Sequence, residues 1–272
     1  MPNDFNQSVI DEFRANRGRV GGYFEGGRLL LLTTIGARTG ERHTTPLGYL
    51  TDETGSRVFV IASAGGSPKN PDWYHNVLAD PAVTIEDGIF THPARASVLA
   101  GAERDEVFAR AVEADPGWLD YESRSGRALP VVALAVRPGP PTAGSLGETL
   151  VLLHDWFRRE LELIRAEIVR SGAVLGAQLR INCLVLCQGL GNHHQGEDQA
   201  LFPMIARQHP ELADVVTRLG EEHAKVAETV DRLRDLLRGR DTATLLPEFD
   251  RLAAELTAHL SYEEEQLLPA LS

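Results

Sequence analysis

The sequence has few cysteines and no long apolar run. Its 272 residues include two cysteines, Cys183 and Cys187, which excludes a disulfide framework, and we expect both to be small apolar core residues. No segment is long and apolar enough to span a bilayer, and the start of the chain lacks a basic region followed by an apolar one. We therefore expect no transmembrane segment, no secretory signal and a cytoplasmic location.

Positive charge is also scarce. The net charge is -12 and no run of Lys or Arg stands out, which argues against a nucleic-acid backbone as the main partner. The apolar fraction of 43% is typical of a globular protein, and the length suits one large domain or two of ordinary size.

The N-terminal half is rich in predicted strands. A short helix capped by Asp4 comes first, and one helix over about 103–113 interrupts the strands. Gly, Pro and Asp punctuate the strands, whose number and spacing predict a small barrel. The expected strands are 29–34, 47–50, 58–62, 82–86, 94–99 and 131–136. The Pro- and Gly-rich segment 138–145 predicts a linker between two domains.

The C-terminal half predicts four helices, near 146–170, 174–207, 211–238 and 243–269. The second is expected to break, because three glycines lie in it and Pro203 follows. Each helix has an apolar stripe with the spacing of a bundle core. Histidines and glutamates fall on these stripes: His154, His193, Glu197, His223, His259 and Glu263.

Metal binding explains why these polar residues lie on core stripes. An unpaired buried carboxylate costs several kcal/mol, and coordination turns carboxylates and imidazoles into ligands. His/carboxylate sets without thiolates suit non-haem iron better than structural zinc. The sequence therefore predicts that the six residues converge on two metal ions.

These residues resemble the hemerythrin family, and more closely its HHE cation-binding branch. The resemblance covers about 148–272 and rests on His154-Asp155, His193-His194-x-x-Glu197-Asp198, Glu222-His223 and His259-x-x-x-Glu263. It implies a di-iron centre, with the six stripe residues as ligands, that binds or reduces dioxygen, peroxide or NO.

The sequence departs from the oxygen-carrying members of that family at the third helix. Those proteins have a second histidine one turn from the first, whereas the neighbours of His223 here are Leu219 and Ala227. One coordination position is therefore open or filled by another group. His194 lies about 100° off the stripe, so we expect it beside a ligand or in solvent. In the run 263–265 we expect only Glu263 to face the core.

The N-terminal half contains two Gly-rich turns after predicted strands. The first, at 33–40, surrounds Arg38 with glycines and hydroxyls, and the second, at 62–76, combines Lys69 with Trp73 and Tyr74. Such turns can hold an anionic tail while aromatic side chains pack on a planar ring.

Together the turns resemble the deazaflavin (F420)-dependent nitroreductase family of split barrels, over about 5–137. The matching pieces include Gly36-x-Arg38-Thr39-Gly40, Ser63-x-Gly65-Gly66 and Lys69-Asn70-Pro71-x-Trp73-Tyr74. The resemblance implies coenzyme F420 as cofactor, and a related branch leaves FMN as an alternative. Departures at Ala37, His43 and Gly48 leave open a barrel that has lost its cofactor and only joins subunits.

Roles carried over from the resemblance cover the cofactor and the acceptor. Those at the cofactor tail are Arg38, Thr39 and His43. Those at its ring are Ala62, Ser63, Ala64, Trp73 and Tyr74. Trp118 and Tyr121 would border a quinone-like or other small acceptor, with Ser63 and Tyr121 as the catalytic candidates. Split barrels of this kind commonly pair, which implies a homodimer.

The sequence as a whole predicts an α+β protein of two domains. Residues 1–138 would form a flavin- or deazaflavin-binding split barrel, and residues 146–272 a hemerythrin-like di-iron four-helix bundle. The expected function is an oxidoreductase in which hydride transfer in the barrel supplies the di-iron centre. The alternative is a bundle that senses iron or oxygen and regulates the barrel without electron transfer.

Overall fold

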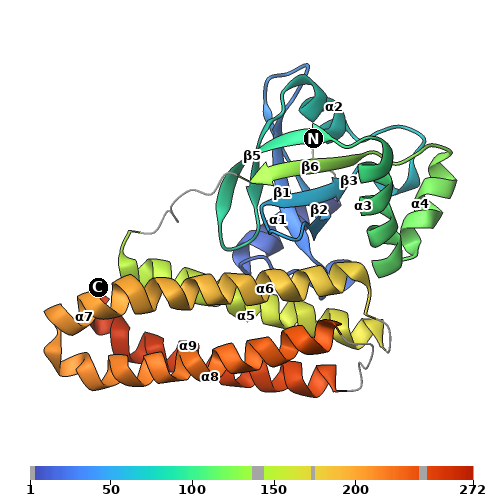
Figure 1. Cartoon of the computed structure of the whole chain (residues 1–272). Coiled ribbons are helices and arrows are strands. Elements are labelled where there is room, and N and C mark those ends of the chain that lie inside the picture. The colour runs from blue at the N-terminus through green and yellow to red at the C-terminus, as the bar shows by residue number, and fades with distance from the viewer. Residues whose placement is uncertain (1–3, 137–143, 173–174, 239–243, 272) are drawn as a thin grey trace. The chain divides into compact units, whose positions relative to one another are not determined.

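The computed structural model describes residues 4–136, 144–172, 175–238 and 244–271. The chain divides into two compact units, one formed by residues 1–140 with 176–181 and the other by residues 141–175 with 182–272. Figure 1 shows that the strands belong to the first unit and the long helices α5, α8 and α9 to the second. The predicted α+β class is confirmed.

Six strands close into a barrel in the first unit (Figure 1). They are β1 (Leu29–Ile35), β2 (Arg42–Thr51), β3 (Arg57–Ile61), β4 (Ala82–Glu86), β5 (Thr91–Val98) and β6 (Val131–Val136). The order around the barrel is β1-β2-β3-β6-β5-β4, and each neighbouring pair is antiparallel. This closure leaves no strand of the barrel at an open edge, and the predicted small barrel is confirmed.

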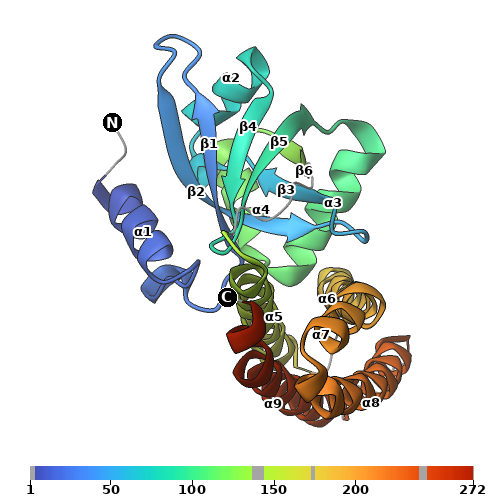
Figure 2. The ribbon, with the colours of Figure 1, turned by 90° about the vertical axis from the view of Figure 1, so that its left-hand side faces the viewer.

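The apolar run in β1 is explained by burial on both faces. Leu30 and Leu32 point into the barrel core, whereas Leu29 and Leu31 pack with residues of α1 (Asp4–Ala15). Side chains alternate along a strand, so a strand covered on both sides needs apolar residues at every position. Figure 2 shows α1 beside β1 and β2.

Parts of the first unit differ from the sequence prediction. The strand β2 begins at Arg42 instead of near Leu47, because its polar first half still pairs with β1. Besides α3 (Gly101–Ala114), which was predicted, the described residues form α2 (Asp72–Ala79) and α4 (Gly117–Ser125). These two helices have eight and nine residues, too short to give a clear 3.6-residue repeat.

The second unit is built from helices, and Figure 2 views its long ones nearly end-on. They are α5 (Leu146–Ser171), α6 (Ala177–Gly196), α7 (Phe202–Gln208), α8 (Ala213–Arg238) and α9 (Leu245–Leu271). The predicted break in the second helix is a π-helical turn, Glu197–Leu201, between α6 and α7. Of the predicted linker, residues 138–143 lie outside the described residues. Ser145 caps α5 by accepting a hydrogen bond from the backbone N–H of Glu148.

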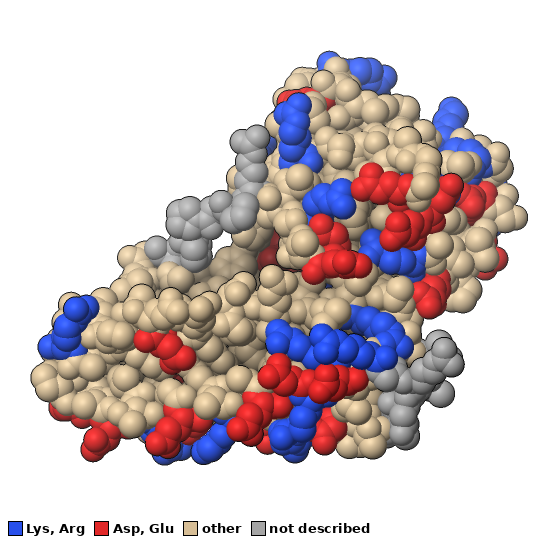
Figure 3. Space-filling model, viewed as in Figure 1, with Lys and Arg blue, Asp and Glu red and all other residues tan. Residues whose placement is uncertain are grey.

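The surface carries charges of both signs. On the face shown in Figure 3, a band of basic side chains on the bundle helices is bordered by acidic ones. None of the described helices combines the length and apolarity that a bilayer span requires.

Candidate functional site

Five histidines and two glutamates meet inside the helical unit. They come from α5 (His154), α6 (His193 and His194), the π turn (Glu197), α8 (His223) and α9 (His259 and Glu263). Within the described residues they form two groups whose ligand atoms lie within 4.8 Å of one another. The first group is His154, His193, Glu197 and Glu263, and the second is His194, His223 and His259.

The two glutamates connect the groups. Glu197 places Oε1 at 3.3 Å from Nε2 of His193 and Oε2 at 3.6 Å from Nε2 of His223. Glu263 places Oε2 at 3.5 Å from Nε2 of His154 and 3.8 Å from Nε2 of His259. Each carboxylate therefore reaches histidines of both groups, as a bridging ligand between two cations would.

The converging atoms lack partners. Nε2 of each of the five histidines and both carboxylate oxygens of Glu197 and Glu263 are buried without a hydrogen-bond partner among the described residues. Buried polar atoms are nearly always satisfied, because leaving one unpaired costs about 1–3 kcal/mol. A site of this composition fits cations, which all of these atoms can bind.

The protonation states agree with that reading. Burial, together with the nearby Glu263 carboxylate, raises the pKa of Glu197 to about 10, and burial raises the pKa of Glu263 to about 8. Burial lowers the pKa of His193 to about 3. Without a cation both carboxyls would be protonated at neutral pH, whereas a bound cation favours the carboxylate.

Three further carboxylates hold the outer nitrogens of the histidines. Nδ1 of His154 lies 2.8 Å from Glu264, Nδ1 of His223 lies 2.8 Å from Asp198, and Nδ1 of His259 lies 3.0 Å from Glu222. Such contacts fix the ring orientation so that Nε2 faces the centre of the cluster. The sequence prediction missed these partners, although each is adjacent in sequence to a predicted ligand.

Glu264 corrects the expectation for the acidic run 263–265, in which only Glu263 was assigned to the core. Its side chain is 20% exposed and contacts both His154 and Arg158. Although burial alone would raise it, hydrogen bonds with His154 and Arg158 lower the pKa of Glu264 to about 2. Glu264 thus stays ionised beside the imidazole that it orients.

Of the two places expected for His194, the structure shows the one beside a predicted ligand, His223, and not the one in solvent. Its side chain is buried, and its ring stacks on that of His223 with centroids 3.9 Å apart and planes 8° apart. The prediction assumed one narrow stripe on the helix. Adjacent residues lie about 100° apart on a helix, and here His193 faces the first group of ligands while His194 faces the second.

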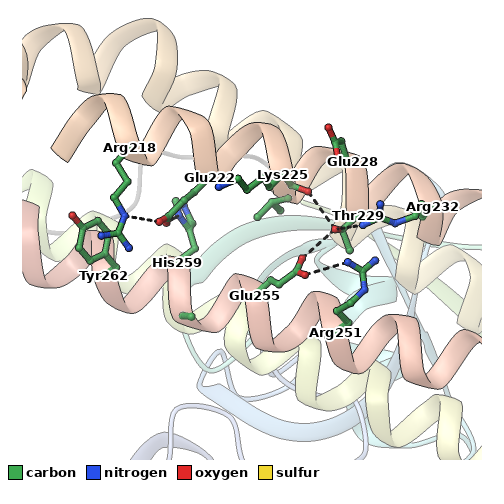
Figure 4. Close-up of a pocket in the computed structure, with 12 residues that line it drawn as sticks. Arg218, Glu222, Lys225, Glu228, Thr229, Arg232, Arg251, Glu255, His259 and Tyr262 are labelled. Atoms are coloured by element: carbon green, nitrogen blue, oxygen red, sulfur yellow. Dashed lines mark hydrogen bonds and ion pairs between the residues drawn. The ribbon is translucent and has the colours of Figure 1, made fainter. Parts of the chain in front are cut away.

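Two grooves reach the histidines from outside. One, of about 540 Å³, runs between α6 and α8 and is lined by His194 and His223 together with Gly191, Gly220 and Ala227. The other, of about 470 Å³, lies between α8 and α9. In Figure 4, Arg218, Glu222 and His259 lie in line across this second groove. Arg218 donates a hydrogen bond of 2.9 Å to Glu222. In this groove the Arg218–Glu222 ion pair therefore lies next to His259.

The barrel residues predicted for a cofactor tail lie at the β1–β2 turn. Arg38 and Thr39 are exposed and His43 is half-buried. Gly36 has no room for a side chain there, because an added Cβ would lie 2.5 Å from Oγ1 of Thr39. Asn76 fixes this turn to α2 by accepting from the backbone N–H of Ala37 and donating to Thr34.

The second predicted turn follows β3. Ala62 is buried and Ser63 is half-buried, and Ala64, Gly65 and Gly66 then have positive φ angles of 46°, 63° and 84°. Successive left-handed residues turn backbone N–H groups toward one side, as in anion-binding turns.

Two arginines that the sequence prediction did not single out lie near this turn. The side chain of Arg124 covers Gly66. Arg127 donates from Nη2 to the backbone carbonyls of Ala62 and Lys69. Its Nε and Nη1 are buried without a partner among the described residues, which suits an anionic or carbonyl group of a ligand.

The aromatic candidates occupy two environments. Trp73 is buried in the barrel core, and Tyr74 packs against that core. Tyr121 shares a hydrogen bond of 2.9 Å with the exposed Tyr23, and Trp118 lies edge-on to Tyr121. The hydrogen bond with Tyr23, followed by burial, raises the pKa of Tyr121, which keeps its hydroxyl protonated.

Comparison with protein families gives two matches, one for each half of the chain. Residues 6–135 match the model of the F420H(2)-dependent quinone reductases. Residues 146–271 match the model of the hemerythrin HHE cation binding domain.

Individual relatives match the N-terminal half. The F420H(2)-dependent quinone reductase of Mycobacterium tuberculosis strain H37Rv is 37% identical over 133 residues, which are 46% of this chain and 85% of that protein. The protein with the same description from strain CDC 1551 matches to the same extent. A solved structure described as an F420-H2 dependent reductase is 36% identical with a TM-score of 0.36, covering 39% of this chain and 93% of that one.

Proposed function

Because the chain belongs to the F420H(2)-dependent quinone reductase family through its N-terminal half and carries a hemerythrin HHE cation binding domain in its C-terminal half, we propose that it is an F420-dependent oxidoreductase with a di-iron centre. In this proposal the iron centre reacts with O2 or a related small oxidant such as peroxide or NO. A quinone-like acceptor is the substrate of the barrel.

One observation carries the metal part of the proposal: nine buried nitrogen and oxygen atoms on seven residues converge without a hydrogen-bond partner in the part of the chain that the structure describes. The ligands proposed from the sequence are His154, His193, Glu197, His223, His259 and Glu263. Two non-haem iron ions would supply a redox-active pair there. Burial lowers the pKa values of His154, His193 and His223. Glu264, Asp198 and Glu222 fix the rings of His154, His223 and His259.

In the barrel, the proposed cofactor supplies a hydride. Arg38, Thr39 and His43 would bind its anionic tail at the β1–β2 turn. The ring would lie near the residues after β3, including Ala62, Ser63, Ala64, Trp73 and Tyr74, and the unpaired donors of Arg127 would meet an anionic or carbonyl group. Ser63 and the protonated hydroxyl of Tyr121 would act as hydrogen-bond donors to the acceptor. FMN in place of F420 is the alternative for the same site.

In this proposal the barrel passes electrons from the reduced cofactor to the di-iron centre of the bundle. Oxidation of F420H2 would release two electrons and two protons. Two ferric ions would accept one electron each and the protons would pass to solvent, so one reduced cofactor matches one di-iron centre. The test is stopped-flow mixing of reduced F420 with the ferric protein without oxygen. We expect cofactor oxidation and loss of the ferric absorption to occur together, with one F420H2 consumed per two irons.

The His193→Ala variant separates this proposal from regulation without electron transfer. If electrons pass from the cofactor to iron and then to oxygen, the His193→Ala variant should no longer oxidise reduced F420 in the presence of oxygen. Full cofactor-dependent reductase activity that is insensitive to oxygen in this variant, together with ferric protein that reduced F420 never bleaches, would contradict the coupling. Metal analysis and an absorption spectrum of the purified protein show beforehand whether iron and cofactor are bound.

A further inference from the structure

His194 lies where a metal ligand is missing. The helix α8 offers His223 to the second group of ligands, but the residues one turn before and after it are Leu219 and Ala227, which have no ligand atom. Without His194 the second group would therefore contain only the two imidazoles of His223 and His259. The side chain of His194 comes from the neighbouring helix and fills this gap.

The environment of His194 favours a ligand over a packing residue. Nε2 of His194 is buried and has no hydrogen-bond partner among the described residues. A ring nitrogen of His194 lies within 4.8 Å of ligand nitrogens of His223 and His259. A histidine that only fills the core would leave this nitrogen unpaired at a cost in stability, whereas a cation between the three rings satisfies all of them.

We infer that His194 is a seventh metal ligand and that the second cation is held by three imidazoles. The inference rests on the proposed di-iron centre. The two cations would then have unequal ligands: His154 and His193 with the Glu197 and Glu263 carboxylates for the first, and three imidazoles for the second. The two carboxylates also come within 3.6 Å of His223 and 3.8 Å of His259. Two of the imidazoles that would hold the second cation, His194 and His223, line the α6–α8 groove.

Two substitutions distinguish ligation from packing. His194→Phe keeps an aromatic ring to stack on His223 but has no ligand atom, and His194→Ala removes both. His209→Ala is the control, because His209 is a partly exposed histidine of the same unit that pairs with Glu211 outside the cluster. Each full-length protein is loaded with iron, passed over a desalting column with a weak chelator, and measured for iron per chain and by Mössbauer spectroscopy.

The expected result is two irons per chain with two distinct Mössbauer signals in the wild type and in His209→Ala. Both His194 variants should keep one iron and bind the second at least about 10-fold more weakly. Two irons and an unchanged spectrum in His194→Phe would overturn this inference and leave the di-iron proposal intact. Wild-type protein that holds no iron would overturn both.

Discussion

Nδ1 of His223 lies 2.8 Å from Oδ1 of Asp198, so the carboxylate of the π turn fixes an imidazole of α8. The same relationship joins His154 to Glu264 and His259 to Glu222. In each case the carboxylate follows or precedes a ligand in sequence and orients a histidine on another helix. These contacts fix the imidazole rings on α5, α8 and α9, so that Nε2 of His154, His223 and His259 points into the cluster.

The Asp198→Asn variant should weaken iron binding without unfolding the bundle. The amide keeps the shape of the side chain but removes the charge that supports the His223 imidazole, and losses of this kind typically cost about 10–100-fold in metal affinity. Competition with a coloured chelator measures the change. Asp235→Asn is the control, since Asp235 pairs with Arg238 on the exposed face of the same helix. Equal affinities in the two variants would contradict a role for Asp198.

The metal-free protein should lose stability as the pH rises. Glu197 and Glu263 have pKa values of about 10 and 8 in the folded state, above the ordinary value of 4.5. Groups with raised pKa values stabilise the fold fully below their unfolded pKa, and this stability is lost as the pH rises through the folded values. The melting temperature of chelator-treated protein should therefore fall as the pH rises from about 4.5 to about 10, the range between the ordinary and the raised pKa values.

Two comparisons test this pH dependence: iron loading of the wild type and substitution of the two carboxyls. Iron-loaded protein should show a smaller fall, because bound cations favour the ionised carboxylates. The Glu197→Gln/Glu263→Gln double variant, which cannot ionise at these positions, should also show a flatter profile without metal. A metal-free wild type whose melting temperature is constant over this range would show that these carboxyls do not titrate as the buried environment requires.

The sequence predicted the parts of the site that follow a helical repeat. His154, His193, Glu197, His223, His259 and Glu263 lie four, three or seven residues from apolar core positions, so spacing alone placed them on the inner faces. The barrel was predictable because its strands are apolar runs between Gly, Pro and Asp. These signals depend on residues close together in the sequence.

The rest depends on contacts between helices. Nothing in the local pattern showed that Glu264 meets His154, which is 110 residues away in the sequence. The burial of His194 likewise depends on the position of α8, because its ring stacks on His223. The unpaired donors of Arg127 could not be anticipated either, since they result from how β3 and the segment before β6 fold around that side chain.

Filling the α6–α8 groove should slow reactions at iron. Ala227 and Gly220 line this groove with His194 and His223, and a Cβ added at Gly220 would meet nothing within 4 Å. The Ala227→Phe variant should keep its iron but react more slowly with oxygen in the ferrous state, by stopped-flow absorption. Ala213→Phe, at an exposed position on the first turn of the same helix, is the control. An unchanged rate in Ala227→Phe would show that small molecules enter elsewhere.

Arg127 should be required for cofactor binding in the barrel. Two of its guanidinium nitrogens are buried and have no partner within the described ranges, while Nη2 donates to the carbonyls of Ala62 and Lys69. Arg127→Lys retains a positive charge but not the planar set of donors. We expect this variant to bind F420 at least about 10-fold more weakly, equivalent to about 1.4 kcal/mol.

The measurement for Arg127 is a titration of F420 followed by fluorescence, with iron content determined on the same samples. Arg95→Lys, on the exposed side of β5, is the matched control. Loss of F420 binding with unchanged iron would assign Arg127 to the barrel site alone. If Arg127→Lys binds F420 as tightly as the wild type, the unpaired nitrogens do not contact the cofactor, and Arg127 serves to hold the chain after β3 in place. Loss of both F420 and iron would instead indicate a general folding defect, which thermal melting of the variant would reveal.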